Sequence, residues 1–231
     1  MKPFPPQSPS SIADFEGCSK RWFLTKIEKK YPYVQNEQAK WGDEVHKKLE
    51  NYTANQVALP DYLEYLAPII DNLRADHQLF AEIPVAITHD WEPTDFWNKS
   101  GKCMLRGKID LVAVDPESAT AYVIDWKSGK RKPDPFQLNI YAAVLKRVLG
   151  LKTVAAGYAW IKTKEHDLYT VDDSNFDEIK ADIDSRIQKM KEAYEQGNYI
   201  ARTSPLCCWC PAVNDCEEAV FYKENSSRYR K

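Results

Sequence analysis

The sequence predicts an α/β protein in which a mixed β-sheet is flanked by helices. Apolar residues at helical spacing mark both ends of the chain, and between them short runs of β-branched and aromatic residues alternate with turn sequences. The chain has 231 residues, of which 43% are hydrophobic, so it is long enough to bury a sizeable core. We expect a single domain over residues 1–231, with a helical N-terminal region at 1–80, the sheet-containing core at 81–172, and a helix with a cysteine-rich tail at 173–231.

The individual helices follow from apolar spacing, and the strands follow from short apolar runs. Ser10 and Ser11 can cap a first helix that continues to Ile27. Pro133 and Pro135 suit the start of a later helix, because proline is tolerated in the first turn. In chain order, we expect helices at about 12–27, 36–52 and 61–80, strands at 83–87, 103–114 and 119–125, a helix from Pro133 to about Leu149, strands at 155–162 and 167–171, and a helix at 173–195.

Charge and hydropathy exclude several classes of protein. The 32 basic residues nearly balance the 34 acidic ones, which argues against a disordered polyelectrolyte and gives no global sign of nucleic-acid binding. No run of 18 apolar residues is present, so we expect no membrane span. The N-terminal segment lacks the apolar core of a secretory signal, which favours a cytoplasmic protein. No phosphate-binding G-x-x-x-x-G-K-[ST] motif is present, so an ATP-driven motor is not expected.

Four of the six cysteines fall within ten residues. In a reducing cytosol, such a cluster more often holds a metal or acts in catalysis than forms disulfides. Three thiols at Cys207, Cys210 and Cys216, with Cys18 as a fourth, suit tetrahedral Zn²⁺ or an iron–sulfur cluster, and spacing alone leaves both open. Cys208 is an alternative to Cys207.

Two apolar strands carry polar residues at matched ends. Asp110 falls within the strand expected at 103–114, while Asp125 and Lys127 end the next one. Residues two apart on a strand share a face, and a meander would bring the two carboxylates together. Convergent carboxylates suit Mg²⁺ or Mn²⁺, an ion that stabilises a phosphodiester transition state and activates water, and a nearby lysine can orient that water. Each residue alone is more readily explained as a solvated turn residue, so the inference depends on the whole set.

Five ordered motifs resemble the PD-(D/E)XK nucleases of the RecB-like branch. The resemblance extends from about Ser8 to Cys216, and it implies a restriction-endonuclease-like core of mixed sheet and flanking helices. The motifs are Gly42-x-x-x-His46, the acidic residue Glu82, Gly107-x-x-Asp110, Asp125-x-Lys127 and Gln137-x-x-x-Tyr141.

The resemblance implies a metal site and a catalytic lysine. His46, Asp110 and Asp125 would hold Mg²⁺ or Mn²⁺, helped by the main-chain carbonyl of Trp126. Lys127 would be the catalytic lysine. The alternative for His46 is a packed or surface histidine on its helix.

Further residues are implied to complete the site and to contact DNA. Glu82 would be an additional catalytic acid, with a solvated position at a helix–strand junction as the alternative. Gln137 and Tyr141 would support the site and contact DNA. Basic residues near the site are expected to bind phosphates. These are Arg106, Lys130 and Arg131.

The cysteine pattern is similar to that of the AddB nuclease domain and of the CRISPR-associated single-strand exonucleases. These relatives carry one N-terminal and three C-terminal cysteines around a [4Fe-4S] cluster. The resemblance therefore implies a cluster held by Cys18, Cys207, Cys210 and Cys216, with Zn²⁺ as the alternative. We expect its role to be structural, joining the N-terminal helix to the tail.

We expect a metal-dependent DNA nuclease, and within that class an exonuclease acting on single-stranded DNA or free ends. The alternatives are a structure-specific endonuclease, a non-catalytic DNA-binding subunit of a recombination or repair complex, and a zinc-stapled structural protein. The presence of Asp110, Asp125 and Lys127 together favours an enzyme. A helicase or recombination protein is a candidate partner. Phage replication, host repair and CRISPR adaptation are all compatible settings, while polarity, the choice between DNA and RNA and the oligomeric state stay open.

Overall fold

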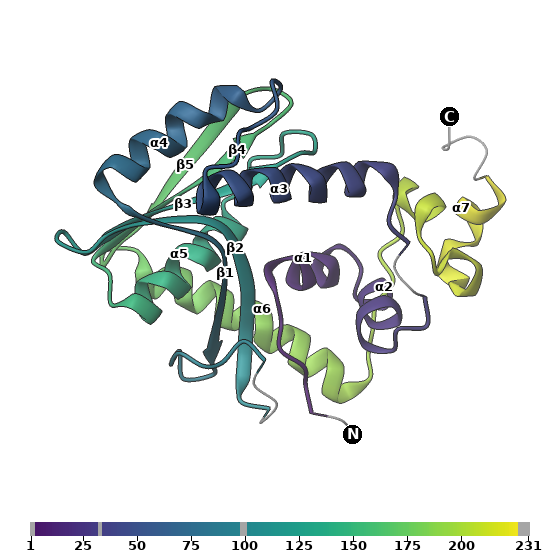
Figure 1. Ribbon diagram of the computed structural model, residues 1–231. Coiled ribbons are helices and arrows are strands. Elements are labelled where there is room, and N and C mark those ends of the chain that lie inside the picture. The colour runs from purple at the N-terminus through teal and green to yellow at the C-terminus, as the bar shows by residue number, and fades with distance from the viewer. Residues whose placement is uncertain (1–2, 32–33, 98–100, 226–231) are drawn as a thin grey trace. The chain divides into compact units, whose positions relative to one another are not determined.

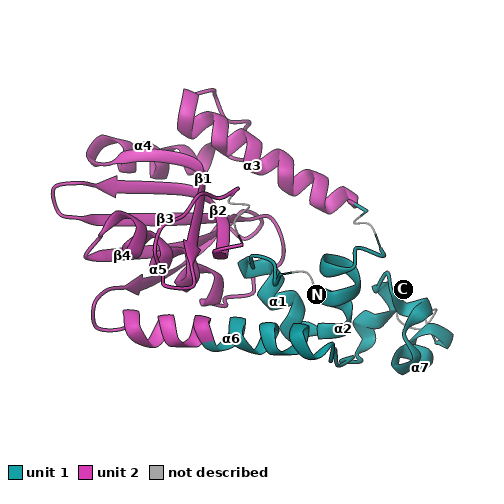
Figure 2. Cartoon of the chain, turned by 90° about the horizontal axis from the view of Figure 1, so that it is seen from below, with its two compact units in different colours: residues 1–34, 185–231 teal, residues 35–184 magenta. Residues whose placement is uncertain are grey.

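The computed structural model describes residues 3–31, 34–97 and 101–225. The chain divides into two compact units, coloured separately in Figure 2. Unit 1 comprises residues 1–34 and 185–231, and unit 2 comprises residues 35–184. This division into units does not test the expectation of a single domain over residues 1–231, which stays a prediction. Among the helices that the structure describes, none combines the length and apolar character needed to cross a membrane.

Unit 2 contains a mixed five-stranded sheet with the order β1-β2-β3-β4-β5 (Figure 1). All neighbouring strands are antiparallel except β3 and β4, which are parallel. Parallel neighbours need a long crossover, and helix α5, Phe136–Leu149, provides it. The predicted α/β class with a mixed sheet is confirmed. The strands are β1 Gln78–Thr88, β2 Cys103–Asp115, β3 Thr120–Lys127, β4 Thr153–Trp160 and β5 Glu165–Val171.

Helices cover both faces of this sheet (Figures 1 and 2). On one face, α3 (Glu37–Asn55) and α4 (Ala67–Asp76) bury a common core against β2 and β3. Leu49, Leu111 and Trp126 are each at most 2% exposed in this core. Burying a large apolar side chain contributes about 1.5–3 kcal/mol, so this core fixes the helix that carries His46 against the strands that carry the acidic residues.

Unit 1 combines segments from both ends of the chain. The hydroxyl of Ser19 donates to the carbonyl of Ile200 at 3.1 Å and accepts from its N–H at 2.8 Å. The ring of Phe23 stacks on Tyr199 with centroids 4.0 Å apart. Besides the end of α6 (Phe176–Gln196), its elements are α1 Pro9–Gly17, α2 Ser19–Trp22, the π-helical turn η1 Phe23–Ile27, the 3-10 turns η3 Pro205–Trp209, η4 Val213–Asp215 and η5 Glu217–Ala219, and α7 Val220–Glu224.

The first predicted helix differs from the observed one. Helix α1 begins at Pro9 and is capped by Ser8, whose hydroxyl accepts from Ser11 N–H at 3.2 Å, so Ser10 and Ser11 are not its cap. The helix is also interrupted at Cys18, which has an extended backbone. The Cys18 thiol caps the next helix by accepting from Arg21 N–H.

The third helix is shorter than the predicted range of 61–80. Helix α4 ends at Asp76, and residues 78–80 pair with residues 112–114 as the start of β1. Apolar spacing in this segment is compatible with either structure, and pairing with β2 decides in favour of a strand.

Candidate active site

The sheet register brings the acidic residues together. Leu111 pairs with Ile124 across β2 and β3, which places Asp110 beside Asp125. The main-chain N–H of Trp126 donates to Asp110 Oδ2 at 2.8 Å. On the other side of β2, the β1 residues flanking Glu82 pair with those flanking Asp110, so Glu82 lies opposite Asp110.

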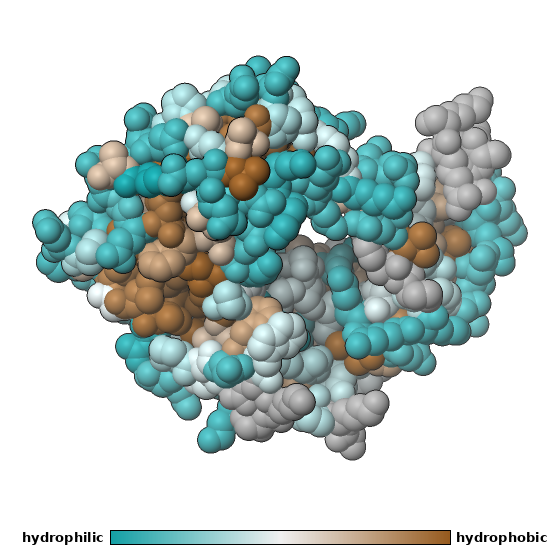
Figure 3. Space-filling model, in the orientation of Figure 1, coloured by the Kyte–Doolittle hydropathy of each residue, from teal (hydrophilic) through white to brown (hydrophobic). Residues whose placement is uncertain are grey.

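Three residues from three elements form a group of potential metal ligands. One ligand atom from each of His46, Glu82 and Asp110 lies within 4.8 Å of the others, and no second such group occurs among the described residues. His46 Nδ1 is 3.2 Å from Asp110 Oδ1 and 3.9 Å from Glu82 Oε1. The group lines a pocket of about 430 Å³ that also includes Gly42 and Ser128. Figure 3 shows a largely hydrophilic surface along α3, the helix that carries His46.

Glu82 has an unusual backbone conformation. Its φ of 55° is left-handed, although the residue lies inside strand β1. Such a conformation costs on the order of 1–3 kcal/mol for a non-glycine residue and is held only when the surroundings fix it. Here the Glu82 carboxylate accepts from Lys108 Nζ at 2.6 Å, and this hydrogen bond is the main cause that raises the pKa of Lys108.

Asp125 lies next to this group but is more deeply buried. Its side chain is 5% exposed, and Oδ1 accepts from Gln137 Nε2 at 2.8 Å. Lys127 Nζ lies 2.7 Å from Oδ2 and forms an ion pair with it, and within the described part of the chain Oδ2 has no other polar partner. Lys127 also donates to Gln137 Oε1 at 2.8 Å. The Gln137 amide therefore joins the carboxylate to the lysine.

Burial and neighbouring charges shift the pKa of two residues in the site. Burial raises the pKa of Asp125 to about 6; Lys127 opposes that rise and Asp110 adds to it. Burial acts to lower the pKa of His46, but its hydrogen bond to Asp110 and the nearby carboxylate charges outweigh burial and raise it. A buried carboxylate oxygen without a hydrogen bond, beside two further carboxylates and an imidazole, fits a hard divalent cation such as Mg²⁺ or Mn²⁺.

Residues from two of the sequence motifs pack against each other. Tyr141 is 6% exposed, and its hydroxyl accepts from Gln137 Nε2 at 3.2 Å. A Cβ on Gly107 would lie 2.7 Å from Cε1 of the Tyr141 ring, so only glycine leaves room for this ring. Burial and the charge of Asp125 raise the pKa of Tyr141. Tyr141 is thus buried beside Gln137, and its predicted roles in supporting the site and contacting DNA stay predictions.

Tyr158 belongs to the site but was not predicted from the sequence. It pairs with Asp125 in the parallel register of β3 and β4, and Lys127 Nζ lies 5.1 Å from the centre of its ring. Its hydroxyl donates to the Asp134 carbonyl at 2.8 Å. Only the register of two parallel strands joined through α5 reveals this contact, and no local motif marks it.

The predicted DNA-contacting basic residues are not gathered in the metal pocket. Arg131 forms ion pairs with Asp167 and Glu165. Arg106 donates to the Phe96 carbonyl at 3.0 Å and stacks on the Phe96 ring. Lys130 is exposed.

In unit 1, the four predicted cluster ligands line one cavity. They are Cys18, Cys207, Cys210 and Cys216. Main-chain N–H groups donate to two of the sulfur atoms: Arg21 and Arg202 to Cys18 Sγ, each at 3.5 Å, and Ser204 to Cys207 Sγ at 3.4 Å. Cys208 is fully buried and donates to the Tyr222 carbonyl at 3.3 Å, so it lies outside the thiol set.

The spacing of these thiols bears on the metal they suit. Tetrahedral Zn²⁺ with Zn–S bonds of about 2.3 Å needs sulfur atoms about 3.8 Å apart. No three of the described cysteines have all their sulfur atoms within 4.8 Å of one another. Burial raises the pKa of Cys210 and Cys216, so a bound cation is needed to favour their thiolates. The choice between an iron–sulfur cluster and Zn²⁺ stays a prediction.

Comparison with known proteins gives a family and a fold. The sequence profile of the PD-(D/E)XK nuclease superfamily matches residues 6–217. Curated proteins gave no match to the chain. Among solved structures, 24 chains match. One is the crystal structure of SSO0001, which is 14% identical, with a TM-score of 0.51 over 95% of this chain and 89% of that chain. At that identity the likeness supports a shared fold alone.

Proposed function

Since the chain belongs to the PD-(D/E)XK nuclease superfamily, we propose that it is a metal-dependent deoxyribonuclease that hydrolyses single-stranded DNA from its ends. The catalytic assignment depends on one observation: a group of potential metal ligands lies next to a buried aspartate and a lysine. His46, Glu82 and Asp110 form the ligand group, and Asp125 and Lys127 lie beside it under a shared amide from Gln137.

The metal would be held by His46, Glu82, Asp110 and Asp125, and the carbonyl of Trp126 stays a predicted ligand. When bound, Mg²⁺ or Mn²⁺ supplies a Lewis acid for the phosphate and lowers the pKa of an attacking water. Oδ2 of Asp125 is buried and, within the described residues, has no hydrogen bond beyond its ion pair with Lys127, so it keeps lone pairs for a metal ion.

Lys127 is the residue that we assign to the reacting groups. Its ammonium lies 2.8 Å from Gln137 Oε1, 2.7 Å from Asp125 Oδ2 and 5.1 Å from the centre of the Tyr158 ring, so three neighbours position it. A positioned ammonium can hydrogen-bond the attacking water and stabilise charge on the phosphate, and it needs no reorganisation during the reaction. Its side chain is 30% exposed, so the group is reachable from solvent.

The cysteine cavity supports a [4Fe-4S] cluster held by Cys18, Cys207, Cys210 and Cys216. The resemblance to iron–sulfur exonucleases favours it over zinc, and the main-chain N–H groups that donate to the sulfur atoms of Cys18 and Cys207 would stabilise bound thiolates. The same resemblance is what favours an exonuclease over a structure-specific endonuclease. A non-catalytic DNA-binding subunit is disfavoured, because the acidic residues and Lys127 are all present and adjacent.

The proposal is tested with end-labelled linear DNA and circular single-stranded DNA of matched sequence. We expect Mg²⁺- or Mn²⁺-dependent shortening of the linear single strand, no cutting of the circle, and no reaction in EDTA. Cutting of the circle would instead assign an endonuclease. Binding without cleavage in either metal would favour the non-catalytic subunit.

A further inference from the structure

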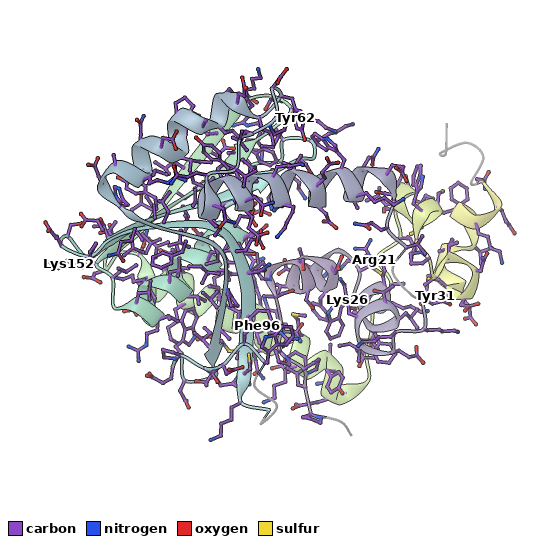
Figure 4. All side chains as sticks on the ribbon, in the orientation of Figure 1. Arg21, Lys26, Tyr31, Tyr62, Phe96 and Lys152 are labelled. Carbon is purple, nitrogen blue, oxygen red and sulfur yellow. The ribbon has the colours of Figure 1, made fainter. Side chains whose placement is uncertain are left out.

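Unit 1 contains another cleft, which shares Arg21 with the thiol cavity. Its volume is about 460 Å³. The N-terminal segment supplies one wall, and Trp209 and Pro211 of the tail supply the other. Figure 4 shows three of the N-terminal lining residues around α2 and η1. The residues used below are Asp14, Arg21, Lys26, Tyr31 and Trp209.

Trp209 offers a flat apolar surface in this cleft. It is 55% exposed, although Trp22, Trp91 and Trp126 are almost completely buried. It ends the 3-10 turn η3 and lies between Cys207 and Cys210, two of the proposed cluster ligands. An indole left open to water in the wall of a cleft is suited to stacking on a planar ligand.

The opposite wall carries positive charge that is only partly neutralised. Asp14 accepts from Arg21 Nη2 at 2.6 Å and lies 3.4 Å from Lys26 Nζ. One carboxylate therefore faces two cations, and the side chains of Arg21 and Lys26 are 37% and 49% exposed. Each cation keeps unused N–H donors. The Tyr31 hydroxyl is directed to Asp215 and does not offset this excess.

We propose that this cleft binds one nucleotide of single-stranded nucleic acid, with its base stacked on Trp209 and its phosphate held by Arg21 and Lys26. The assignment rests on the proposed function for its choice of ligand. A surplus of cations next to an open aromatic ring is the combination used by sites that hold single strands without reading their sequence. A lone phosphate would leave Trp209 unused, and an apolar ligand would leave the two cations unused.

The test is fluorescence anisotropy of a labelled oligothymidylate in EDTA, where cleavage does not occur. We expect Trp209→Ala to weaken binding about fivefold or more, and Trp209→Phe to retain most of it, because a ring remains for stacking. We expect Lys26→Gln to reduce the slope of log affinity against log salt by about 0.7, which corresponds to one phosphate contact. The control is Trp97→Ala, since Trp97 is 73% exposed on the β1–β2 connection of unit 2.

Each result decides the proposal. Wild-type binding and salt slope in both Trp209→Ala and Lys26→Gln would overturn it, as would equal weakening by Trp97→Ala. Because Trp209 adjoins two cysteines, the iron content of Trp209→Ala is measured in parallel, and if iron is lost the Lys26→Gln result decides. Failure of the proposed function looks different: the wild type would bind the oligonucleotide, respond to these substitutions, and cut nothing with metal.

Discussion

Gln137 connects the two residues most directly implicated in the chemistry. Its amide nitrogen donates to Asp125 and its amide oxygen accepts from Lys127, so a single side chain fixes their relative position. The contact with the Tyr141 hydroxyl in turn restrains the amide. An amide can fill this position because it offers a donor and an acceptor together, whereas a carboxylate would repel Asp125.

We expect Gln137→Ala to lower kcat by about 10–100-fold, the range usual for residues that orient metal ligands. The loss arises because Asp125 and Lys127 are no longer held by a common partner. Steady-state kinetics at saturating metal measure it, with thermal unfolding to confirm the fold. Gln188→Ala is the matched control, because Gln188 contacts Glu192 on an exposed face of α6. Equal rates for Gln137→Ala and the wild type would contradict this role.

Glu82 is expected to contribute to metal affinity. Replacing it by glutamine keeps its size and removes its charge, so we expect Glu82→Gln to weaken Mn²⁺ binding by about tenfold or more, measured by calorimetry without DNA. Glu50→Gln is the control, since Glu50 lines the same pocket but pairs with Lys47. If both variants bound Mn²⁺ as the wild type does, Glu82 would not be a ligand.

At the residue scale, the sequence predicted which residues lie together in the site but not the contacts that position them. Spacing and strand ends were enough to select Asp110, Asp125 and Lys127. The left-handed backbone of Glu82 and the ring of Tyr158 beside Lys127 could not be predicted, because both depend on strand register. Arg106 and Arg131 are close in sequence to the site residues. In the structure, however, Arg106 donates to the Phe96 carbonyl and Arg131 forms an ion pair with Asp167.

At the scale of elements, the packing of helix α5 against strand β2 depends on a glycine, because a side chain at that position would collide with the helix. Gly107 leaves the space that the Tyr141 ring occupies, so the two motifs act as one packing unit. A strand glycine is ordinarily unfavourable, and here the close approach of the ring explains it.

We expect Gly107→Ala to destabilise the protein by about 1–3 kcal/mol, the usual cost of overpacking a buried site. Urea unfolding at equilibrium measures this change, and cleavage is expected to fall with it as Tyr141 is displaced from Gln137. Gly129→Ala is the control, because nothing lies within 4 Å of a Cβ placed there. Equal stabilities of the two variants would show that Tyr141 moves aside at no cost.

Element types were predictable from the sequence, and the boundaries were less so. The spacing of apolar residues and the positions of turn residues predicted the order of strands and helices in unit 2. The break at Cys18 was missed, since the apolar spacing continues through it and the thiol that caps α2 is not a recognised capping group. The start of β1 was missed because its first residues become a strand only by pairing with β2.

At the scale of the whole molecule, the cysteines join residues from opposite ends of the sequence within unit 1. Cys18 follows the first helix, and the other three ligands lie in the tail. A bound cluster would therefore close a loop of nearly the entire chain, and long loops are those whose closure is most unfavourable without a link.

We expect the purified protein to be brown and to contain about four iron atoms and four sulfides per chain. Cys18→Ser should lower both and reduce thermal stability, because one ligand and one side of the cavity are lost. Cys103→Ser is the control, since Cys103 is buried in β2 of unit 2. Stoichiometric zinc without iron in anaerobically purified protein would contradict the cluster assignment.

The catalytic role of Lys127 is the central claim, and its most direct test is the initial rate of cleavage of an end-labelled single-stranded oligonucleotide in Mg²⁺ or Mn²⁺. We expect Lys127→Ala to cut at least about 100-fold more slowly than the wild type while remaining folded, as judged by a cooperative thermal unfolding transition. Lys48→Ala, at an exposed position on α3, should cut at the wild-type rate. A Lys127→Ala protein that cuts as fast as the wild type would contradict the assignment of the chemistry to this site.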